Sequence, residues 1–286
     1  MALPHAVDTT NPDEVYRHVI GVFSSHGWRE SQALMEILFR DIARLFRGEW
    51  PGYMACDMRY HDFQHTLQAT VCIVDLVDGQ HRAGATPHLD RREAEKAVAA
   101  ALLHDSGFIK RTHEPAGTGA KYTFVHEQRS CEFARAYLPT IGFAPAEVDD
   151  VCAAIGCTGP RNRISTQTFS GPTNRLIACM LVTADYLAQL AAADYPDELD
   201  ILYAEFAEAY DHENLPPEKR LFKSARDLKQ KTPDFWEKYA RPMLDTEADG
   251  VHRYLTVTGQ PNFYLQAVEA NIAEIRRRLQ AEMAQT

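Results

Sequence analysis

The amino-acid sequence predicts an all-α fold, and two observations carry this prediction. Apolar residues recur at intervals of three and four over most of the 286 residues, as they do along one face of a helix. No segment shows the alternation of apolar and polar residues that is typical of a half-buried strand. Glycine and proline residues separate the periodic stretches, so we expect helices joined by loops.

The first half of the chain contains four predicted helices. An apolar stripe beginning at Val15 ends near Gly27, and a second stripe beginning at Leu34 stops before Gly48. The third helix is expected over Phe63–Val77 and the fourth over Ala94–His104. The fourth is almost entirely apolar, which is typical of a helix buried on all sides.

Residues 106–122 are expected to form a loop, because this segment holds three glycines and a proline. Loops of this length inside a compact domain are often functional, so we expect this one to line the mouth of a site and to act as a mobile lid. Further helices are predicted at His126–Leu138, Ala146–Cys157, Pro172–Ala193, Asp197–Asp211, Glu218–Lys229, Pro233–Tyr239 and Phe263–Met283.

The composition is that of an ordinary globular protein. Hydrophobic residues make up 45% of the chain and charged residues 24%, with a formal net charge of −10. An acidic chain without a basic run is a poor binder of a nucleic-acid duplex. No apolar run approaches the length of a membrane span, and the first residues lack the pattern of a secretory signal, so a cytoplasmic protein is expected.

The six cysteines are scattered and include no C-x-x-C pair. Reduced, mostly buried thiols are therefore expected, rather than a disulfide framework or a structural zinc site.

Ionisable residues in apolar helices are the strongest sign of chemistry. His104-Asp105 follows the apolar run AVAAALL, and Asp185 lies inside LIACMLVTADYLAQL. Buried carboxylates need a cation or hydrogen-bond donors, because burying an unpaired charge is costly. A salt bridge to arginine or lysine would meet this need, but a divalent metal suits a mixed histidine and carboxylate set better.

The order of these residues resembles the H…HD…D pattern of the HD-domain metal-dependent phosphohydrolase superfamily. The pattern is formed by His65, His104-Asp105 and Asp185, with flanks ALLHDSGF and ADYLAQ, and it spans roughly residues 55–195. The segment YHDFQHT also resembles the YHNxxHA signature of the cyclic-nucleotide phosphodiesterase branch, with Asp62 in place of the asparagine.

This resemblance implies a fold and a domain organisation. We expect an HD-domain helical bundle over residues 51–214, N-terminal helices over 1–50 that pack on this core, and a C-terminal helical cap over 215–286.

The resemblance also implies a role for each matched residue. His61 would protonate the leaving oxygen, Asp105 would bridge to a second metal, and His126 would help to bind that metal. One divalent ion (Mn, Mg, Zn or Fe) is expected, with Asp105 as the most buried carboxylate. The implied ligands of the first metal are His65, His104, Asp105 and Asp185.

Related families often carry further histidines in the next helix, where this chain has Ile155-Gly156-Cys157-Thr158. This difference counts against HD-type enzymes that use more histidines. Cys157 is a substitute ligand or, more in keeping with its type, a buried structural residue.

Four polar residues near the motif are candidates for contacts with a small phosphorylated substrate: Arg59, Lys110, Lys121 and Gln189. For any one of the cations, ordinary solvated surface is the alternative interpretation.

Two other functions stay open at this point. One is a metal-binding sensor or scaffold without catalysis, and the other is an HD-type di-iron oxygenase. Metal analysis and a phosphodiesterase assay would separate the enzyme from the scaffold, and oxygen consumption would identify the oxygenase. A homodimer also remains open.

Overall fold

The computed structural model describes residues 7–159, 163–256 and 261–284, and these residues form an all-α fold, as predicted. Among them, backbone pairing of the β type is limited to two isolated bridges, Arg47 with Ala55 and Tyr53 with Arg111. The α-helices are α1 (Pro12–Ser25), α2 (Gln32–Phe46), α3 (Phe63–Arg82), α4 (Arg91–Leu103), α5 (His126–Tyr137), α6 (Pro145–Ile155), α7 (Pro172–Ala191), α8 (Tyr195–His212), α9 (Ala225–Phe235), α10 (Arg241–Thr246) and α11 (Phe263–Ala284).

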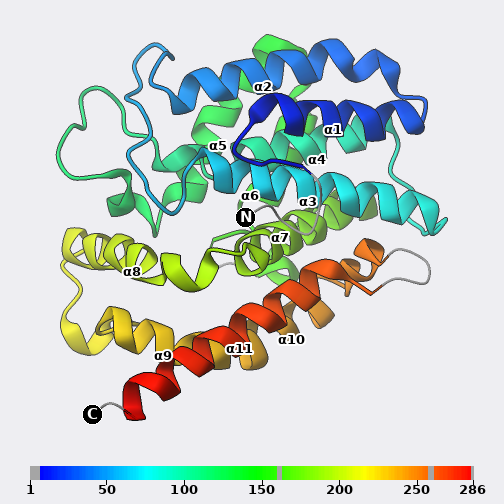
Figure 1. Cartoon of the computed structure of the whole chain (residues 1–286). Coiled ribbons are helices and arrows are strands. Elements are labelled where there is room, and N and C mark those ends of the chain that lie inside the picture. Colours follow the sequence, from blue (N-terminus) through cyan, green and yellow to red (C-terminus); the bar gives the residue numbers. More distant parts are fainter. Residues whose placement is uncertain (1–6, 160–162, 257–260, 285–286) are drawn as a thin grey trace.

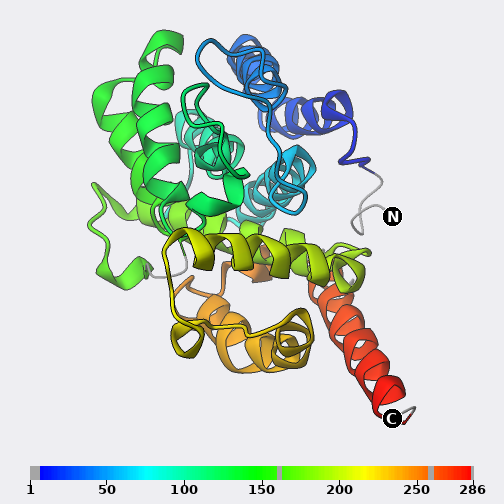
Figure 2. The ribbon, with the colours of Figure 1, turned by 90° about the vertical axis from the view of Figure 1, so that its left-hand side faces the viewer.

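Helices α3, α4 and α7 form the centre of the molecule, and each packs against the other two. Helices α1 and α2 cover α3 and α4 on one side, while α5 and α6 lie on the other (Figure 1). Helices α8, α9 and α11 form a group beneath this bundle, which is clearest in the rotated view (Figure 2). Because α4 is one of the three central helices, the His104-Asp105 doublet that follows it lies in the middle of the fold.

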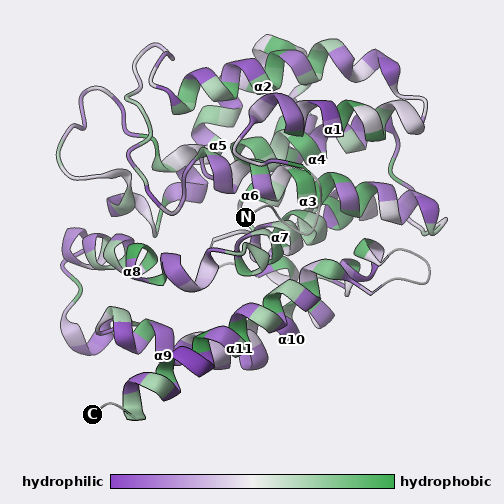
Figure 3. Cartoon of the chain, viewed as in Figure 1, coloured by the Kyte–Doolittle hydropathy of each residue, from purple (hydrophilic) through white to green (hydrophobic). Residues whose placement is uncertain are grey.

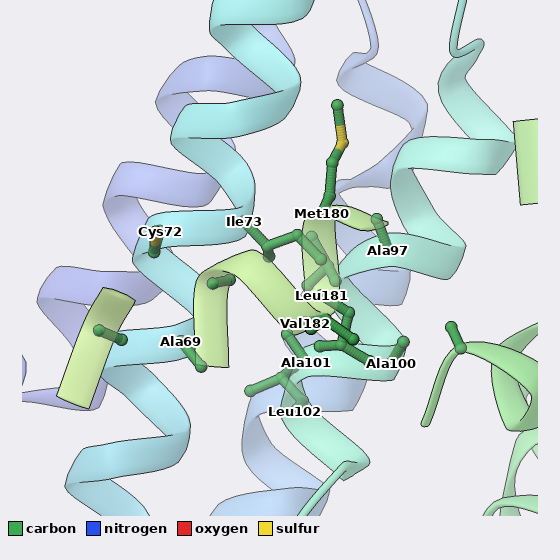
Figure 4. Packing of buried hydrophobic residues seen from close by; sticks show 14 of the residues in the cluster. Ala69, Cys72, Ile73, Ala97, Ala100, Ala101, Leu102, Met180, Leu181 and Val182 are labelled. Carbon is green, nitrogen blue, oxygen red and sulfur yellow. The ribbon is translucent and has the colours of Figure 1, made fainter. Parts of the chain in front are cut away.

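Small side chains allow the three central helices to approach closely. Ala97, Ala100 and Ala101 of α4 belong to one buried cluster with Ala69 of α3 and Val182 of α7 (Figure 4). Burial of these faces removes apolar surface from water, at roughly 25 cal/mol per Å². Hydropathy follows the same plan, with apolar residues concentrated on the central helices and mixed along the peripheral ones (Figure 3).

Two aspartates cap the helices that carry the motif. The Asp62 carboxylate accepts the backbone N–H of His65 at 2.9 Å and so starts α3. Asp90 and Glu93 form a reciprocal capping box at the start of α4. These caps fix the first turn of α3, where His65 lies, and the entry into α4, which ends at the HD doublet.

The C-terminal segment differs from its predicted elements. Helix α9 begins at Ala225, where Ser224 caps it, and residue 218 belongs to a short 3-10 turn. Pro233 was interpreted as a helix start, but it lies inside α9, which passes through a π-helical turn over Trp236–Ala240 into α10. A π turn re-spaces the backbone hydrogen bonds, so the helical path continues beyond a residue that has no N–H.

No single helix among the described residues is long and apolar enough to cross a membrane, although the bent pair α7 and α8 would pass together on length and composition.

A close approach between α3 and the turn over Val251–Leu255 predicts a strong effect of one substitution. A Cβ added at Gly79 would lie 1.8 Å from the carbonyl oxygen of Tyr254, so the backbone would have to move. We expect Gly79→Ala to lower the free energy of unfolding by about 1–3 kcal/mol, as overpacking does. Gly21, in α1, is the matched control, because nothing lies within 4 Å of its added Cβ.

Gly21→Ala should raise the free energy of unfolding by roughly 0.5–1 kcal/mol, since alanine is the better helix former. Urea unfolding of both variants checks this pair. Equal stabilisation by the two substitutions would contradict the close approach.

Candidate metal centre

The four implied ligands come from three helices and meet at one point of the core. His65 lies in the first turn of α3, and Asp185 lies in the middle of α7. His104 is the residue after α4, and Asp105 opens the 3-10 turn that follows. His65, His104 and Asp105 are 4% exposed or less. The apolar C-terminal part of α4 is buried, so the His104-Asp105 doublet that follows the end of this helix lies in the interior.

The ligand atoms lie close to one another. The Oδ2 atom of Asp105 is 3.3 Å from Nε2 of His65 and 3.2 Å from Nε2 of His104. The Oδ1 atom of Asp185 is 3.2 Å and 3.7 Å from the same two nitrogens. Two imidazoles and two carboxylates therefore converge, as the ordered motif led us to expect.

These atoms are close but not hydrogen-bonded to described residues. Nε2 of His65, Nε2 of His104 and Oδ2 of Asp105 are buried, and each lacks a partner with hydrogen-bond geometry. Buried polar atoms without partners are costly, so their presence calls for an explanation. One ligand atom each from His65, His104 and Asp185 lies within 4.8 Å of the other two, which suits a common cation at the centre. The donor set therefore fits a divalent metal.

Backbone carbonyls orient two of the histidines. Nδ1–H of His104 donates to the carbonyl oxygen of Ala101 at 2.8 Å, and Nδ1–H of His126 donates to that of Thr123 at 2.9 Å. Each bond leaves Nε2 as the free nitrogen, which is the form that binds metals. Nε2 of His126 lies 3.7 Å from Oδ1 of Asp105, on the carboxylate oxygen not shared with His65 and His104. Asp105 therefore faces histidines with both oxygens, as a bridging ligand would.

Electrostatics within the cluster favour charged forms of all four groups. Burial alone would lower the pKa of His65, but the negative charges of Asp105 and Asp185 close to its Nε2 raise the pKa to about 9. Burial likewise opposes charge on His104, and Asp105 raises its pKa well above the usual value. Burial would raise the pKa of both carboxyls, but the two imidazoles lower it, well below the usual range for Asp105. The positive charges of the two protonated imidazoles thus offset the negative charges of the two carboxylates.

A side-chain relay holds Asp185. Nε2 of Gln189 donates to Oδ1 of Asp185 at 3.2 Å, and Oε1 of Gln189 accepts the hydroxyl of Tyr60 at 3.0 Å. Gln189 was expected to contact substrate, but both ends of its carboxamide are used by the protein. The structure therefore places Gln189 as a positioning residue for Asp185.

His61 lies beside the cluster and has a partner that the sequence did not reveal. Its Nδ1–H donates to Oε2 of Glu205 at 2.7 Å, and the other oxygen of Glu205 accepts the backbone N–H of Arg59 and of Tyr60. The ring centroids of His61 and His65 are 5.8 Å apart. No motif marks Glu205, which lies in α8, 144 residues further along the chain. Glu205 thus fixes the orientation of the ring through Nδ1, and Nε2 points away from this carboxylate.

Phe108 lies between two of the candidate histidines. Its ring stacks on His126 with a centroid distance of 4.4 Å and on His61 with one of 4.8 Å. The side chain is buried, so it forms an apolar wall between the two imidazoles. Hydrophobic surroundings of this kind restrict the access of water to a metal centre.

The loop over residues 106–122 contributes Phe108 to the surroundings of His61 and His126, but it does not line the cavity that opens at His65. Glu208 of α8 accepts the backbone N–H and the hydroxyl of Thr118, and Asp57 accepts the N–H of Gly119. A Cβ at Gly119 would meet the carbonyl of Phe108 at 2.1 Å, so this glycine allows close packing. The lid motion of the loop stays a prediction.

Lys110 and Lys121 hold this loop together and do not line the cavity at His65. Nζ of Lys110 pairs with Asp57 at 2.8 Å and donates to two loop carbonyls, those of Pro115 and Gly117. Nζ of Lys121 donates to the carbonyls of Glu114 and Ala116. Both ammonium groups are thus occupied by acceptors of the protein, and their contact with a substrate stays a prediction.

Two further expectations concern single residues. Asp105 is not the most buried carboxylate of the described residues, because Glu95 is 1% exposed against 3% for Asp105, held by Arg91 and Arg92. The thiol of Cys157 donates to the carbonyl of Ala153, and burial raises its pKa to about 12, so this residue packs as a structural cysteine.

Arg59 lies where a substrate contact was expected. It lines a cavity of about 140 Å³ beside His65, and its exposed guanidinium makes no ion pair with a described residue.

Models of known protein families give no match to this chain, and a comparison with curated proteins gives none either.

Proposed function

We propose that this chain is a metal-dependent phosphohydrolase of the HD-domain type that hydrolyses a small phosphate ester. One observation carries the proposal: Nε2 of His65, Nε2 of His104 and Oδ2 of Asp105 converge in the core without hydrogen-bond partners, next to Asp185. A sensor without catalysis would need the same ligands, but it would not need His61 oriented beside them by a buried carboxylate.

His65, His104, Asp105 and Asp185 would hold the first cation, and Asp105 with His126 would hold a second. A bound divalent cation lowers the pKa of a coordinated water to about 7 and polarises a phosphoryl oxygen. The protein contributes fixed ligands, since backbone carbonyls and the Gln189 amide keep the side chains in place before any cation binds.

His61 supplies the proton that the leaving group needs. Its Nδ1–H bond to Glu205 fixes the orientation of the ring and directs Nε2 away from that carboxylate. The distance of 5.8 Å between the ring centroids of His61 and His65 supports this role, since an ester bound at the cluster would lie next to His61. Donation from Nε2 to the departing oxygen would complete the cleavage, with Glu205 retaining the ring in position.

Metal analysis followed by a substrate panel tests the proposal. The purified chain should hold about one divalent ion or more per molecule after loading with Mn, Mg, Zn or Fe, and it should release phosphate or cleave a phosphodiester from a panel of small esters. A chain that binds metal but cleaves no ester in the panel, with any of the four metals, would contradict the enzyme and favour the sensor. Oxygen consumption with an iron-loaded chain would favour the oxygenase.

Proton competition predicts how metal affinity depends on pH. Below pH 9 the His65 imidazole is protonated in the metal-free chain, so a cation must displace that proton. Affinity should therefore rise about tenfold per pH unit between pH 7 and 9, more steeply if His104 also loses a proton, and level off above pH 9.

Zinc titration against a chelator of known affinity at pH 7, 8 and 9.5 measures this slope. His113→Ala serves as a control, because His113 is exposed and is not one of the residues that converge on the cluster, and its slope should match that of the unmodified chain. An affinity that stays constant between pH 7 and 9 would contradict displacement of the proton.

A further inference from the structure

A cavity large enough for a small molecule lies beside the cluster. Its volume is about 140 Å³, whereas a single water needs about 15 Å³. His65 forms part of its wall, and so does Gln189, whose amide is bonded to Asp185. A molecule in this cavity would therefore lie directly beside the candidate metal centre.

One buried polar side chain in the wall lacks a partner within the protein. Gln68 is 8% exposed and lines the cavity, and its carboxamide makes no hydrogen bond to another described residue. Gln64, one turn earlier on α3, lines the same space and is half-buried. A carboxamide buried without partners costs about 1–3 kcal/mol, so Gln68 is suited to a ligand that donates and accepts hydrogen bonds.

The charge of the wall is negative. Asp62, Asp194 and Glu198 face the cavity with one cation, Arg59. Asp62 also caps α3, but Asp194 makes no capping bond at α8, and neither Asp194 nor Glu198 forms an ion pair with a described residue. Burial raises the pKa of Glu198, and the neighbouring Asp194 raises it further, while Arg59 lowers it. Such a wall repels a second phosphate and attracts a cation.

We propose that this cavity binds a compact cationic group, an ammonium or guanidinium, on the same molecule whose phosphate reaches the metal centre. This inference rests on the proposed function only where it places the phosphate of the ligand at the metal centre. Asp194 and Glu198 would pair with the cation, and the carboxamides of Gln64 and Gln68 would take its remaining N–H groups or the adjoining polar atoms. The substrate would be an amino- or guanidino-bearing phosphate ester, not a nucleoside polyphosphate.

Binding of two matched probes tests the cavity without requiring turnover. The probes are 2-aminoethyl phosphate and propyl phosphate, which have the same chain length and differ in an ammonium against a methyl group. Calorimetry on the zinc-loaded full chain should show the aminoethyl ester binding about tenfold more tightly, a difference of about 1.4 kcal/mol. The Asp194→Asn/Glu198→Gln double variant should lose this preference and keep its affinity for propyl phosphate.

Glu213→Gln is the matched control, since Glu213 is an exposed carboxylate just after α8 that is not part of the cavity. Its preference should equal that of the unmodified chain. Equal affinity for the two probes, no binding of either, or a preference that survives in a folded double variant would each overturn the proposal. Failure of the phosphohydrolase would appear separately, as a preference for the aminoethyl ester without hydrolysis of any ester in the panel.

Discussion

Replacing His65 with alanine should remove the metal and the hydrolytic activity together. Nε2 of His65 lies close to both Asp105 and Asp185. The substitution therefore removes one of the four proposed ligands, and only the imidazole of His104 then remains beside the two carboxylates. Changes outside the ligand set typically cost 10- to 100-fold in metal affinity, and we expect loss of a ligand to exceed about 100-fold. Elemental analysis of the loaded variant and an ester-cleavage assay measure the two losses.

A folding control is essential for this variant, because a buried charge left unpaired costs about 3–5 kcal/mol. Circular dichroism and urea unfolding show whether the His65→Ala chain is folded under the assay conditions. Asp185→Asn offers a milder route, since the amide keeps the volume of the side chain and its bond to Gln189 through Oδ1. A folded His65→Ala chain that keeps full metal content would remove His65 from the ligand set, whereas Asp185→Asn should lower the affinity for the metal through the loss of charge.

Replacing His61 with alanine should have the second-largest effect and a different character. The first metal should stay bound, because His61 faces Glu205 and is not part of the ligand cluster. Hydrolysis should slow by roughly the 10²–10⁴-fold typical of a lost general acid. The loss should be smallest for a nitrophenyl phosphodiester, since its leaving group departs without a proton.

The comparison of good and poor leaving groups decides the role of His61. Equal slowing for both classes of ester would exclude proton donation, and loss of metal in His61→Ala would make this residue a ligand. Glu205→Gln provides a graded companion, because the amide oxygen can still accept the backbone N–H groups of Arg59 and Tyr60 while the charge is gone. It should slow poor leaving groups by about tenfold and spare good ones, whereas a purely structural role would slow both alike.

The sequence predicted the convergence of His65, His104, Asp105 and Asp185 more fully than its surroundings, and the reason is physical. A helix as apolar as α4 must be buried, so the charged doublet at its end had to enter the core and find partners there. The histidine and aspartate positions follow from that constraint and from the order of the motif. Glu205 carries no comparable constraint, because a single carboxylate on a helix of mixed polarity is ordinary until the fold brings it to His61.

The loop cations were predicted less well for a related reason. Sequence proximity to the motif places Lys110 and Lys121 near the doublet, but it does not say which acceptors compete for them. Both ammonium groups donate to backbone carbonyls of the loop, since backbone acceptors in an irregular segment need hydrogen-bond donors. The cavity residues on α3 and α8 were missed because they meet only through the tertiary packing.

The backbone bonds of His104 and His126 have a consequence for mutational robustness. Both imidazoles are oriented by carbonyl oxygens three residues earlier, Ala101 and Thr123, and every amino acid carries that oxygen. Scanning substitutions at these two supporting positions should therefore spare the orientation of the imidazoles unless the new side chain distorts the main chain. His61 differs, because its orientation depends on the one carboxylate of Glu205. In a saturation library, substitutions at Ala101 and Thr123 should be tolerated for metal binding, while proton donation should be lost through a single change at Glu205 in α8.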